Sequence, residues 1–438
     1  MHESEKARPP SPSLSRRRLL RLAVGAAPGL LLSSATGAAE IGAQALHIGF
    51  VGPFSGPARD TGLEIRQGIL MALKDARDEG EIPARVEGVR RDIQPLWVDS
   101  ASDPERAVIA VRRALTRDHA AMFVGGWHSD VALALMDAEA PYGVMHLGHA
   151  GEALSIAERI NSDYQKYRGW FKGWPTPALL GARYGEPLRY LRRQGLWRPR
   201  NDRVAIMAEN TAYGQGWGEA LFDSLQSSGF SVAQPQLTGP GQMEFGELMQ
   251  SYRRDKISLV LMSTTDGQAA TAFVRQFREH QVPALLVGHG LRWSRDWYAT
   301  TGEASNYVIA MDSAMPMALW QQWWVRRYRY LFGDMPSIAA AGIHYDYTRM
   351  AIRILNATAS LDLDDLIRTV YRLPYRGVWN RYQFASEPME NTVSANEVQA
   401  GSFMEGFFFP LAQLMDGEAR IIWPPRYADQ RFIAPPWL

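Results

Sequence analysis

Three histidines of this chain fall in separate short loops that follow predicted strands: His128, His149 and His289. Neutral imidazoles hydrogen-bond to polar ligands and also coordinate transition metals. The sequence contains no H-E-x-x-H pair, so hydrogen bonding to a ligand or to the backbone is the main interpretation. A metal site completed by Glu209 or Asp346 is the alternative. We predict no resident metal and no cofactor.

Aromatic and basic side chains gather near the same loops. Large rings suit flat, cyclic or apolar ligands, although any one ring taken alone also suits ordinary packing. Arg292 and Arg295 flank Trp293 at positions where a guanidinium could hold a carboxylate or phosphate with two hydrogen bonds. The aromatic residues in or near the loops are Trp127, Trp170, Phe171, Trp174, Trp217, Trp293 and Trp297.

Motifs of common catalytic sites are missing from the sequence. It has no G-x-S-x-G elbow, no Walker loop and no G-x-G-x-x-G fingerprint. Three carboxylates within residues 362–365 fit the acidic first turn of a helix. We therefore predict that the protein is not an enzyme.

Composition limits the partners. The formal net charge of +1 argues against nucleic acid as the main partner. The 438 residues contain no cysteine, which excludes disulfides, thiolate metal sites and lipidation of a cysteine. The length predicts at least two lobes, and a hydrophobic content of 46% supports their cores.

The first 45 residues have the features of a targeting segment. Arg16 and Arg17 lie in a stretch similar to the twin-arginine export motif, and a broken apolar run over 19–32 follows. This run is too short to span a membrane comfortably, and no later run in the chain is long enough. Cleavage is expected after Ala45, with Gly37 as the competing position. A basic disordered tail is the alternative.

Predicted strands and helices alternate along the rest of the chain. Apolar runs at 48–51, 93–98, 121–124 and 143–147 predict the strands of one unit, and runs at 204–208, 230–233, 259–263, 284–287 and 307–310 predict those of another. Helices are expected between them, including one that Ser129 would cap, and long ones over 317–331 and 338–361. Short strands are expected at 379–384, 402–409 and 419–423. The fold class is therefore α/β, with mainly parallel sheets flanked by helices.

Four stretches resemble one known family, the leucine/isoleucine/valine-binding proteins, which are type 1 periplasmic solute-binding proteins of branched-chain amino-acid ABC transporters. They are IGFVGPFSGPARDTGLEIRQGILMALKDA at 48–76, MFVGGWHS at 122–129, NTAYGQG at 210–216 and IIWPP at 421–425. The resemblance implies a two-lobed flytrap joined by hinge crossovers. Residues 46–174 with 313–385 would form lobe 1, and 175–312 with 403–438 would form lobe 2.

The resemblance also implies a site in the cleft between the lobes. Ser129 matches the family serine that binds a ligand carboxylate, with helix capping as the alternative role. Tyr213 matches the tyrosine that covers the ligand from the second lobe. We expect the remaining contacts from other cleft loops. The full predicted set is Ser55, Trp127, His128, Ser129, His149, Tyr213, Thr264, His289, Arg292 and Trp293.

Two departures from the family bear on the ligand. Residues 147–151 lack the hydroxyls that amino-acid binders carry there, and residues 288–292 lack the acid that pairs with an ammonium. A buried ammonium without a carboxylate is costly. We therefore expect a ligand other than a standard amino acid, with an aromatic, cyclic or anionic molecule favoured.

The expected role is ligand capture by a monomer in the periplasm, with lobe closure and delivery to an inner-membrane ABC permease. Two alternatives stay open. One is a ligand-sensing receptor subunit with the same fold. The other is an exported metal-binding or enzymatic protein.

Overall fold

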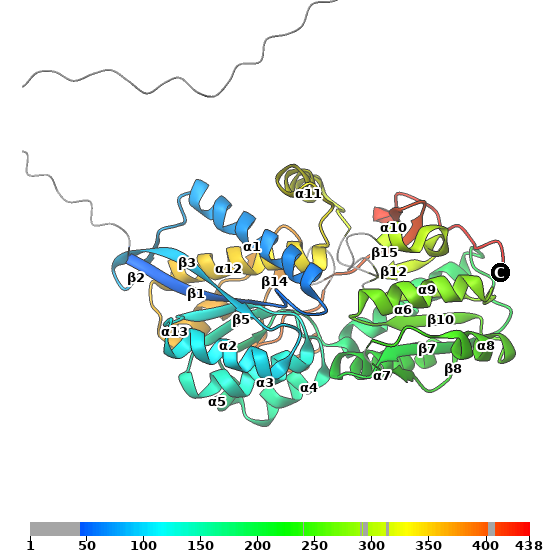
Figure 1. Ribbon diagram of the computed structural model, residues 1–438, viewed down its shortest axis with the longest axis horizontal. Coiled ribbons are helices and arrows are strands. Elements are labelled where there is room, and N and C mark those ends of the chain that lie inside the picture. Colours follow the sequence, from blue (N-terminus) through cyan, green and yellow to red (C-terminus); the bar gives the residue numbers. More distant parts are fainter. Residues whose placement is uncertain (1–43, 240, 290, 292–296, 312–314, 402–407) are drawn as a thin grey trace, which may run out of the picture. The chain divides into compact units, whose positions relative to one another are not determined.

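The computed structural model describes residues 44–239, 241–289, 291, 297–311, 315–401 and 408–438 (Figure 1). Their strands form two large sheets and one small hairpin-like pair. The observed fold is the α/β class that the sequence predicts. The lobe boundaries remain a prediction.

The first sheet has the strand order β2-β3-β1-β4-β5-β6. Its strands are parallel except where β2 pairs with β3. Parallel strands are buried on both faces, which explains the continuous apolar runs in the sequence. The strands are β1 (Gln44–Gly52), β2 (Ala84–Val86), β3 (Val89–Asp99), β4 (Met122–Gly125), β5 (Met145–His149) and β6 (Trp170–Lys172).

The second sheet has the order β16-β15-β12-β11-β10-β7-β8, and β9 also pairs with β7. The two strands of the C-terminal tail, β15 and β16, join its edge in antiparallel fashion. A separate pair is formed by β13 (Tyr375–Arg376) and β14 (Arg381–Tyr382). The strands of the sheet are β7 (Arg203–Glu209), β8 (Ser231–Val232), β9 (Gln236–Thr238), β10 (Leu259–Ser263), β11 (Leu285–His289), β12 (Ile309–Met311), β15 (Leu411–Met415) and β16 (Glu418–Trp423).

Helices cover both faces of each sheet. The α-helices are α1 (Arg59–Asp78), α2 (Pro104–Thr116), α3 (Ser129–Glu139), α4 (Leu154–Ser162), α5 (Tyr164–Tyr167), α6 (Pro177–Arg193), α7 (Ala212–Ser227), α8 (Gly246–Arg254), α9 (Gly267–Glu279), α10 (Trp297–Thr301), α11 (Leu319–Phe332), α12 (Ile343–Thr358) and α13 (Leu363–Arg372). Among the described residues, every helix is too short or too polar to cross a membrane.

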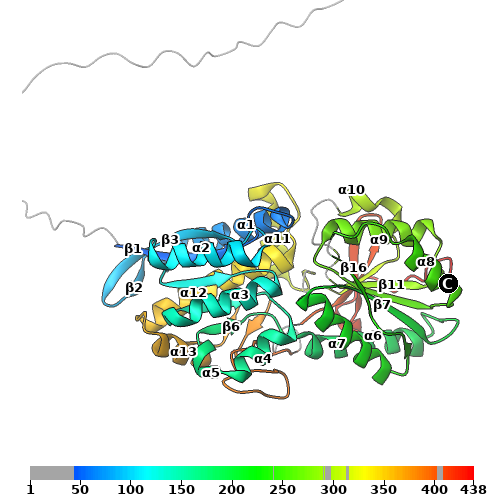
Figure 2. The same cartoon turned by 60° about the horizontal axis from the view of Figure 1, so that its bottom comes forward.

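Side-chain alternation along the strands divides the core. In β4, Met122 and Val124 pack with α1 and α12, while Phe123 packs with α2 and α3. In β7, Val204 packs toward α6 and α7, and Ala205 toward α8 and α9. Figure 2 shows α9 and the α6–α7 pair on opposite faces of the second sheet. The period of two residues in a strand produces this division.

Several local predictions are confirmed and others are wrong. Asp103 caps α2 by accepting the Arg106 N–H, and Pro104 is the first helical residue, as predicted. The strand expected at 379–384 is reduced to β14, and most of the one expected at 402–409 lies outside the described residues. The long helix expected from 338 begins with a π-helical turn, Ile338–Gly342. Any Cβ at Gly342 would lie 2.5 Å from Trp379 Nε1, so only glycine fits there.

Candidate functional site

A cavity of about 1420 Å³ is lined by loops from both sheets. The loops follow the carboxyl ends of β4, β5, β7 and β10, which is where open α/β sheets bind ligands. The described residues of its wall that carry rings, hydroxyls or charges include Asp60, Trp127, His128, Ser129, Asp130, Glu152, Trp174, Glu209, Thr211, Tyr213, Thr264, Thr265, Asp266 and Arg275.

Two glycines shape the loop after β4. Gly125 and Gly126 have φ angles of +83° and +120°, a region that favours glycine. A Cβ at Gly126 would lie 2.2 Å from the His149 ring, and one at Gly125 would lie 2.6 Å from His344. The bare backbone therefore packs directly on two buried imidazoles and carries Trp127 into the cavity wall.

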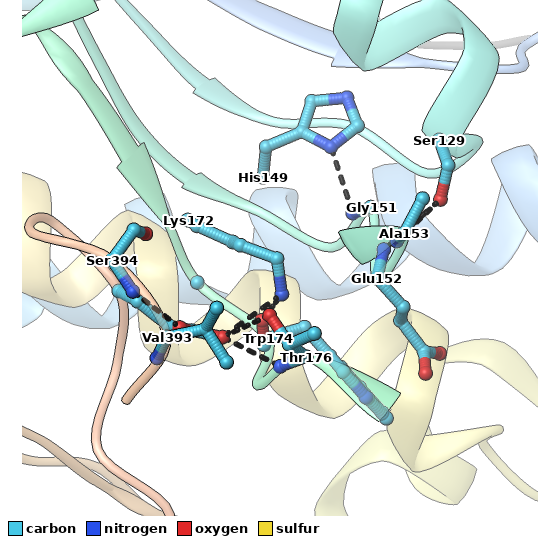
Figure 3. Close-up of polar contacts among 12 residues, drawn as sticks. Ser129, His149, Gly151, Glu152, Ala153, Lys172, Trp174, Thr176, Val393 and Ser394 are labelled. Carbon is cyan, nitrogen blue, oxygen red and sulfur yellow. Dashed lines mark hydrogen bonds and ion pairs between the residues drawn. The ribbon is translucent and has the colours of Figure 1, made fainter. Parts of the chain in front are cut away.

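Ser129 joins two loops of the first sheet. Its Oγ accepts the backbone N–H of Glu152 at 3.0 Å and that of Ala153 at 3.1 Å (Figure 3). These bonds use both lone pairs of the hydroxyl, which leaves its proton to donate. Within the described part of the chain no group accepts that proton, and Ser129 lines the cavity. The predicted role as cap of α3 is wrong, because His128 occupies the cap position and Ser129 bonds the next loop instead.

His128 places an imidazole beside this hydroxyl in the chain. Burial lowers its pKa to about 4, so the ring is neutral at pH 7. Its Nδ1 is buried and has no hydrogen-bond partner among the described residues. A buried polar atom without a partner costs free energy, which a bound ligand can recover.

Glu209 holds the second-sheet wall together. At the end of β7 it accepts hydrogen bonds from the hydroxyls of Thr211 and Thr264, both at 2.8 Å, and from the Thr265 N–H at 2.7 Å. The Thr264 hydroxyl proton is thus donated to a carboxylate of the protein. All these partners are hydrogen-bond donors, as suits a carboxylate acceptor. Among the described residues no group of three or more His, Asp or Glu side chains is arranged to hold a metal ion.

Tyr213 lines the cavity from the first turn of α7. Thr211 caps this helix by accepting the Gly214 N–H at 3.2 Å. The Tyr213 oxygen accepts a 3.1 Å hydrogen bond from Ser263, and burial raises its pKa well above the usual value. The phenol therefore stays neutral, and its ring packs near the His289 ring, with 6.4 Å between the centroids.

Glu152 reaches from the loop after β5 to the second sheet's helix α7. Its Oε2 accepts a 2.6 Å hydrogen bond from Trp217 Nε1, and its Oε1 lies 3.6 Å from His289 Nε2. The Trp217 and His289 rings are 4.0 Å apart, and Tyr184 O–H lies 3.0 Å from His289 Nδ1. Glu152 was not among the predicted site residues, although it directly follows residues 147–151, where His149 was expected to contact the ligand.

Three predicted residues, Ser55, His149 and His289, are not part of the cavity wall. His149 and His289 are the last residues of β5 and β11, because both strands run two residues further than predicted. His149 packs against Trp170, its Nδ1 accepts the Gly151 N–H at 2.8 Å, and burial lowers its pKa well below normal. Ser55 donates its hydroxyl to Asp99 at 2.6 Å. The cavity wall includes none of these three.

The other predicted residues divide into two groups. Trp127, His128, Ser129, Tyr213 and Thr264 all line the cavity. Arg292 and Trp293 belong to the residues that the structure does not describe.

The cavity wall is acidic. The described lining residues include five carboxylates and one guanidinium, from Asp60, Asp130, Glu152, Glu209, Asp266 and Arg275. The prediction that a ligand ammonium would lack a carboxylate partner rested on residues 288–292 alone, whereas the acids that line the cavity come from other loops.

Comparisons with known proteins agree with this architecture. A family model described as "Periplasmic binding protein" matches residues 45–400. A Leu/Ile/Val-binding protein from Rhizobium johnstonii is 22% identical over 61% of this chain and 68% of its own. A leucine-, isoleucine-, valine-, threonine- and alanine-binding protein from Pseudomonas aeruginosa is 22% identical over 62% and 67%.

Solved structures share the fold at lower identity. A protein described as a branched-chain amino acid ABC transporter from Silicibacter pomeroyi has a TM-score of 0.77 and 19% identity, over 90% of this chain and all of that one. An ABC transporter solute-binding protein from R. palustris in complex with benzoate has a TM-score of 0.67 and 16% identity, over 86% and 95%. Likeness at this identity shows the fold alone.

Proposed function

Because this chain belongs to the periplasmic binding protein family, we propose that it captures a ring-bearing small organic acid in the cavity between its two sheets and delivers it to an ABC permease. Proteins of this family are solute-binding components of transporters rather than enzymes, and they act in the periplasm. The ligand class and its contacts are our inference from the cavity wall.

The observation that carries the proposal is the pair His128 and Ser129. The serine hydroxyl has filled both lone pairs and keeps only a proton to donate, so it is suited to a ligand acceptor such as a carboxylate oxygen. The imidazole next to it presents a buried Nδ1 that lacks a partner in the described structure. A ligand that meets both groups would remove an existing desolvation cost.

Aromatic residues in the cavity wall support a ligand that contains a ring. Trp127 and Trp174 line the cavity from the first sheet and Tyr213 lines it from the second. Rings at such positions stack on or pack edge-to-face against a flat ligand. The excess of carboxylates disfavours a ligand with several negative charges, whereas one carboxylate can be held by the Ser129 donor. A relative of the same fold is described in complex with benzoate, and another with 3,4-dihydroxybenzoic acid.

An amino acid is the second candidate. The Glu152 carboxylate lines the cavity, where it accepts a hydrogen bond from Trp217 and lies 3.6 Å from His289 Nε2, so it could also meet an ammonium group. The curated relatives named above are described as binding leucine, isoleucine and valine. This candidate predicts that affinity requires both the carboxylate and the ammonium of the ligand.

Calorimetric titration separates the two candidates. The panel contains benzoate, 3,4-dihydroxybenzoate and cyclohexanecarboxylate on one side, and leucine, isoleucine and valine on the other. We expect micromolar binding in the first group and at least a tenfold loss of affinity in Ser129→Ala. Ser162→Ala is the matched control, since its exposed hydroxyl donates to the Arg159 carbonyl in its own helix. Micromolar binding of leucine, with no binding of the ring acids, would overturn the proposal in favour of the second candidate.

Export and assembly state are part of the same proposal. We propose twin-arginine export through Arg16 and Arg17, which lie outside the described residues, and a monomeric mature protein. Neither follows from the fold.

A further inference from the structure

Helix α11 carries exposed aromatic side chains on its outer face. Trp323 is 64% exposed and Tyr330 is 88% exposed, and Leu319 before them is 67% exposed. Residues 319, 323, 326 and 330 follow one another at helical spacing, so they share one face. Arg326 supplies a charge in the middle of this row. We call these four residues the outer row.

The opposite face of α11 is fixed to the protein, so the exposure is not a sign of a loosely packed helix. Trp324, Val325 and Tyr328 are buried, and Tyr328 O–H donates to Gln67 of α1 at 2.5 Å. Arg327 pairs with the buried Asp75 of the same helix α1. The fold thus holds the outer row in a defined direction, and no described residue covers it.

The charge of α11 has one sign. Residues 319–332 include Arg326, Arg327 and Arg329 and no aspartate or glutamate. Arg327 already forms an ion pair with Asp75. Arg326 and Arg329 are exposed, and among the described residues neither has a carboxylate within ion-pair distance. The face therefore combines amphipathic rings with two available guanidinium groups.

We propose that the outer row of α11, with Arg329, docks on an anionic lipid surface. Tryptophan and tyrosine favour the headgroup region of a bilayer, where one end of the ring is apolar and the other is wet. Guanidinium groups beside them pair with lipid phosphates and gain from the negative surface potential. A second copy of this chain is a poorer occupant, because two arginine rows would face each other without any acid. This inference does not depend on which ligand the cavity binds.

Vesicle co-sedimentation tests the proposal on protein recovered from the periplasm. One set of vesicles is phosphatidylethanolamine with phosphatidylglycerol at 3:1, and the other is phosphatidylcholine alone. We expect the unchanged protein to sediment with the anionic vesicles at low salt and to be released by 0.5 M NaCl. We expect the bound fraction to fall at least fivefold in Trp323→Ala/Tyr330→Ala and also in Arg326→Gln/Arg329→Gln.

The control is Ile109→Ala, which removes a side chain that is 70% exposed on α2. The Ile109→Ala variant should sediment like the unchanged protein. All variants should have the melting temperature of the unchanged protein. Equal sedimentation of the unchanged protein with and without anionic lipid would overturn the proposal. Analytical ultracentrifugation without lipid tests the alternative partner. If the unchanged protein forms concentration-dependent dimers and the α11 variants do not, the proposal is overturned and the face binds a second copy of the chain.

Discussion

Trp217 Nε1 donates a 2.6 Å hydrogen bond to Glu152 Oε2, and this bond connects a loop of the first sheet to a helix on the second. Both side chains are buried, and Glu152 also lines the cavity. The bond therefore stabilises the arrangement in which the cavity walls of the first and second sheets lie close together.

Trp217→Phe should weaken ligand binding by favouring the separated arrangement of the two sheets. A hydrogen bond to a charged acceptor contributes about 1.5–3 kcal/mol, so we expect roughly a tenfold or greater loss of affinity. Small-angle scattering at saturating ligand should show a larger radius of gyration than the unchanged protein. Trp197→Phe is the control, because the Trp197 indole is equally buried but has no hydrogen-bond partner among the described residues. Equal affinities in the two variants would contradict the prediction.

Ser129→Ala should also destabilise the ligand-free protein. The substitution leaves the N–H groups of Glu152 and Ala153 without their acceptor, at a cost of about 1–3 kcal/mol. Urea unfolding measures this loss, with Ser162→Ala expected to change stability by less than about 0.5 kcal/mol. An unchanged unfolding midpoint in Ser129→Ala would mean that water replaces the hydroxyl.

His128 should make stability depend on pH between about 4 and 6.5. Burial lowers its pKa in the folded protein to about 4, whereas the unfolded chain takes up the proton near 6.5. The unfolded state thus binds more protons in this window, and the free energy of unfolding falls as the pH drops through it. His128→Gln keeps a polar side chain but removes the titration.

Urea unfolding at pH 7.5, 6.5, 5.5 and 4.5 tests this effect as a difference between the two proteins. The loss of stability on acidification should be smaller in His128→Gln than in the unchanged protein. The comparison is needed because Asp346, whose pKa burial raises to about 7, acts in the opposite direction over the same range. Parallel pH profiles for the two proteins would show that His128 titrates normally.

Lys172→Met should be strongly destabilising. Lys172 and Glu397 are both fully buried, with Nζ and Oε1 3.3 Å apart, and Glu397 also accepts the Thr176 N–H at 2.6 Å and the Val393 N–H at 2.6 Å (Figure 3). The pair connects residues 172–176, where the chain passes from the first sheet to the second, with the segment before β15 that contains Glu397. Removing one partner of a buried pair costs about 3–5 kcal/mol.

The matched control for Lys172 is Lys74→Met. Lys74 pairs with Asp78 on the surface, where both side chains are 56% exposed. Exposed pairs contribute at most about 1 kcal/mol. Thermal unfolding of both variants measures the contrast, and similar melting temperatures would argue that the buried pair is replaceable.

Replacing Arg16 and Arg17 with lysine should leave the precursor in the cytoplasm. The prediction rests on the sequence alone, from the arginine pair and the apolar run that follows it. Fractionation of cells that express either form measures periplasmic yield. An undiminished yield from the double variant would exclude the twin-arginine route.

The α/β class and the order of most elements follow from the sequence, because apolar strand runs and capped helices are local signals. The runs that became β4 and β10 are examples, as is the Asp103-Pro104 start of α2. Trp127 could be selected in advance because residues that follow parallel strands share one edge of a sheet. Ser129 and Tyr213 were selected because they match positions of the family that the sequence resembles.

Contacts between distant residues were decided only by the tertiary structure. Glu152 and Trp217 lie 65 positions apart, and neither has a local pattern that points to the other. Two extra residues at the ends of β5 and β11 place His149 and His289 in strands instead of the expected loops, and neither is part of the cavity wall. Strand ends depend on which neighbours supply backbone hydrogen bonds, and the partner of a polar side chain depends on which loops meet. The sequence encodes both the strand ends and these side-chain partners, but the spacing of residue types along the chain does not reveal them.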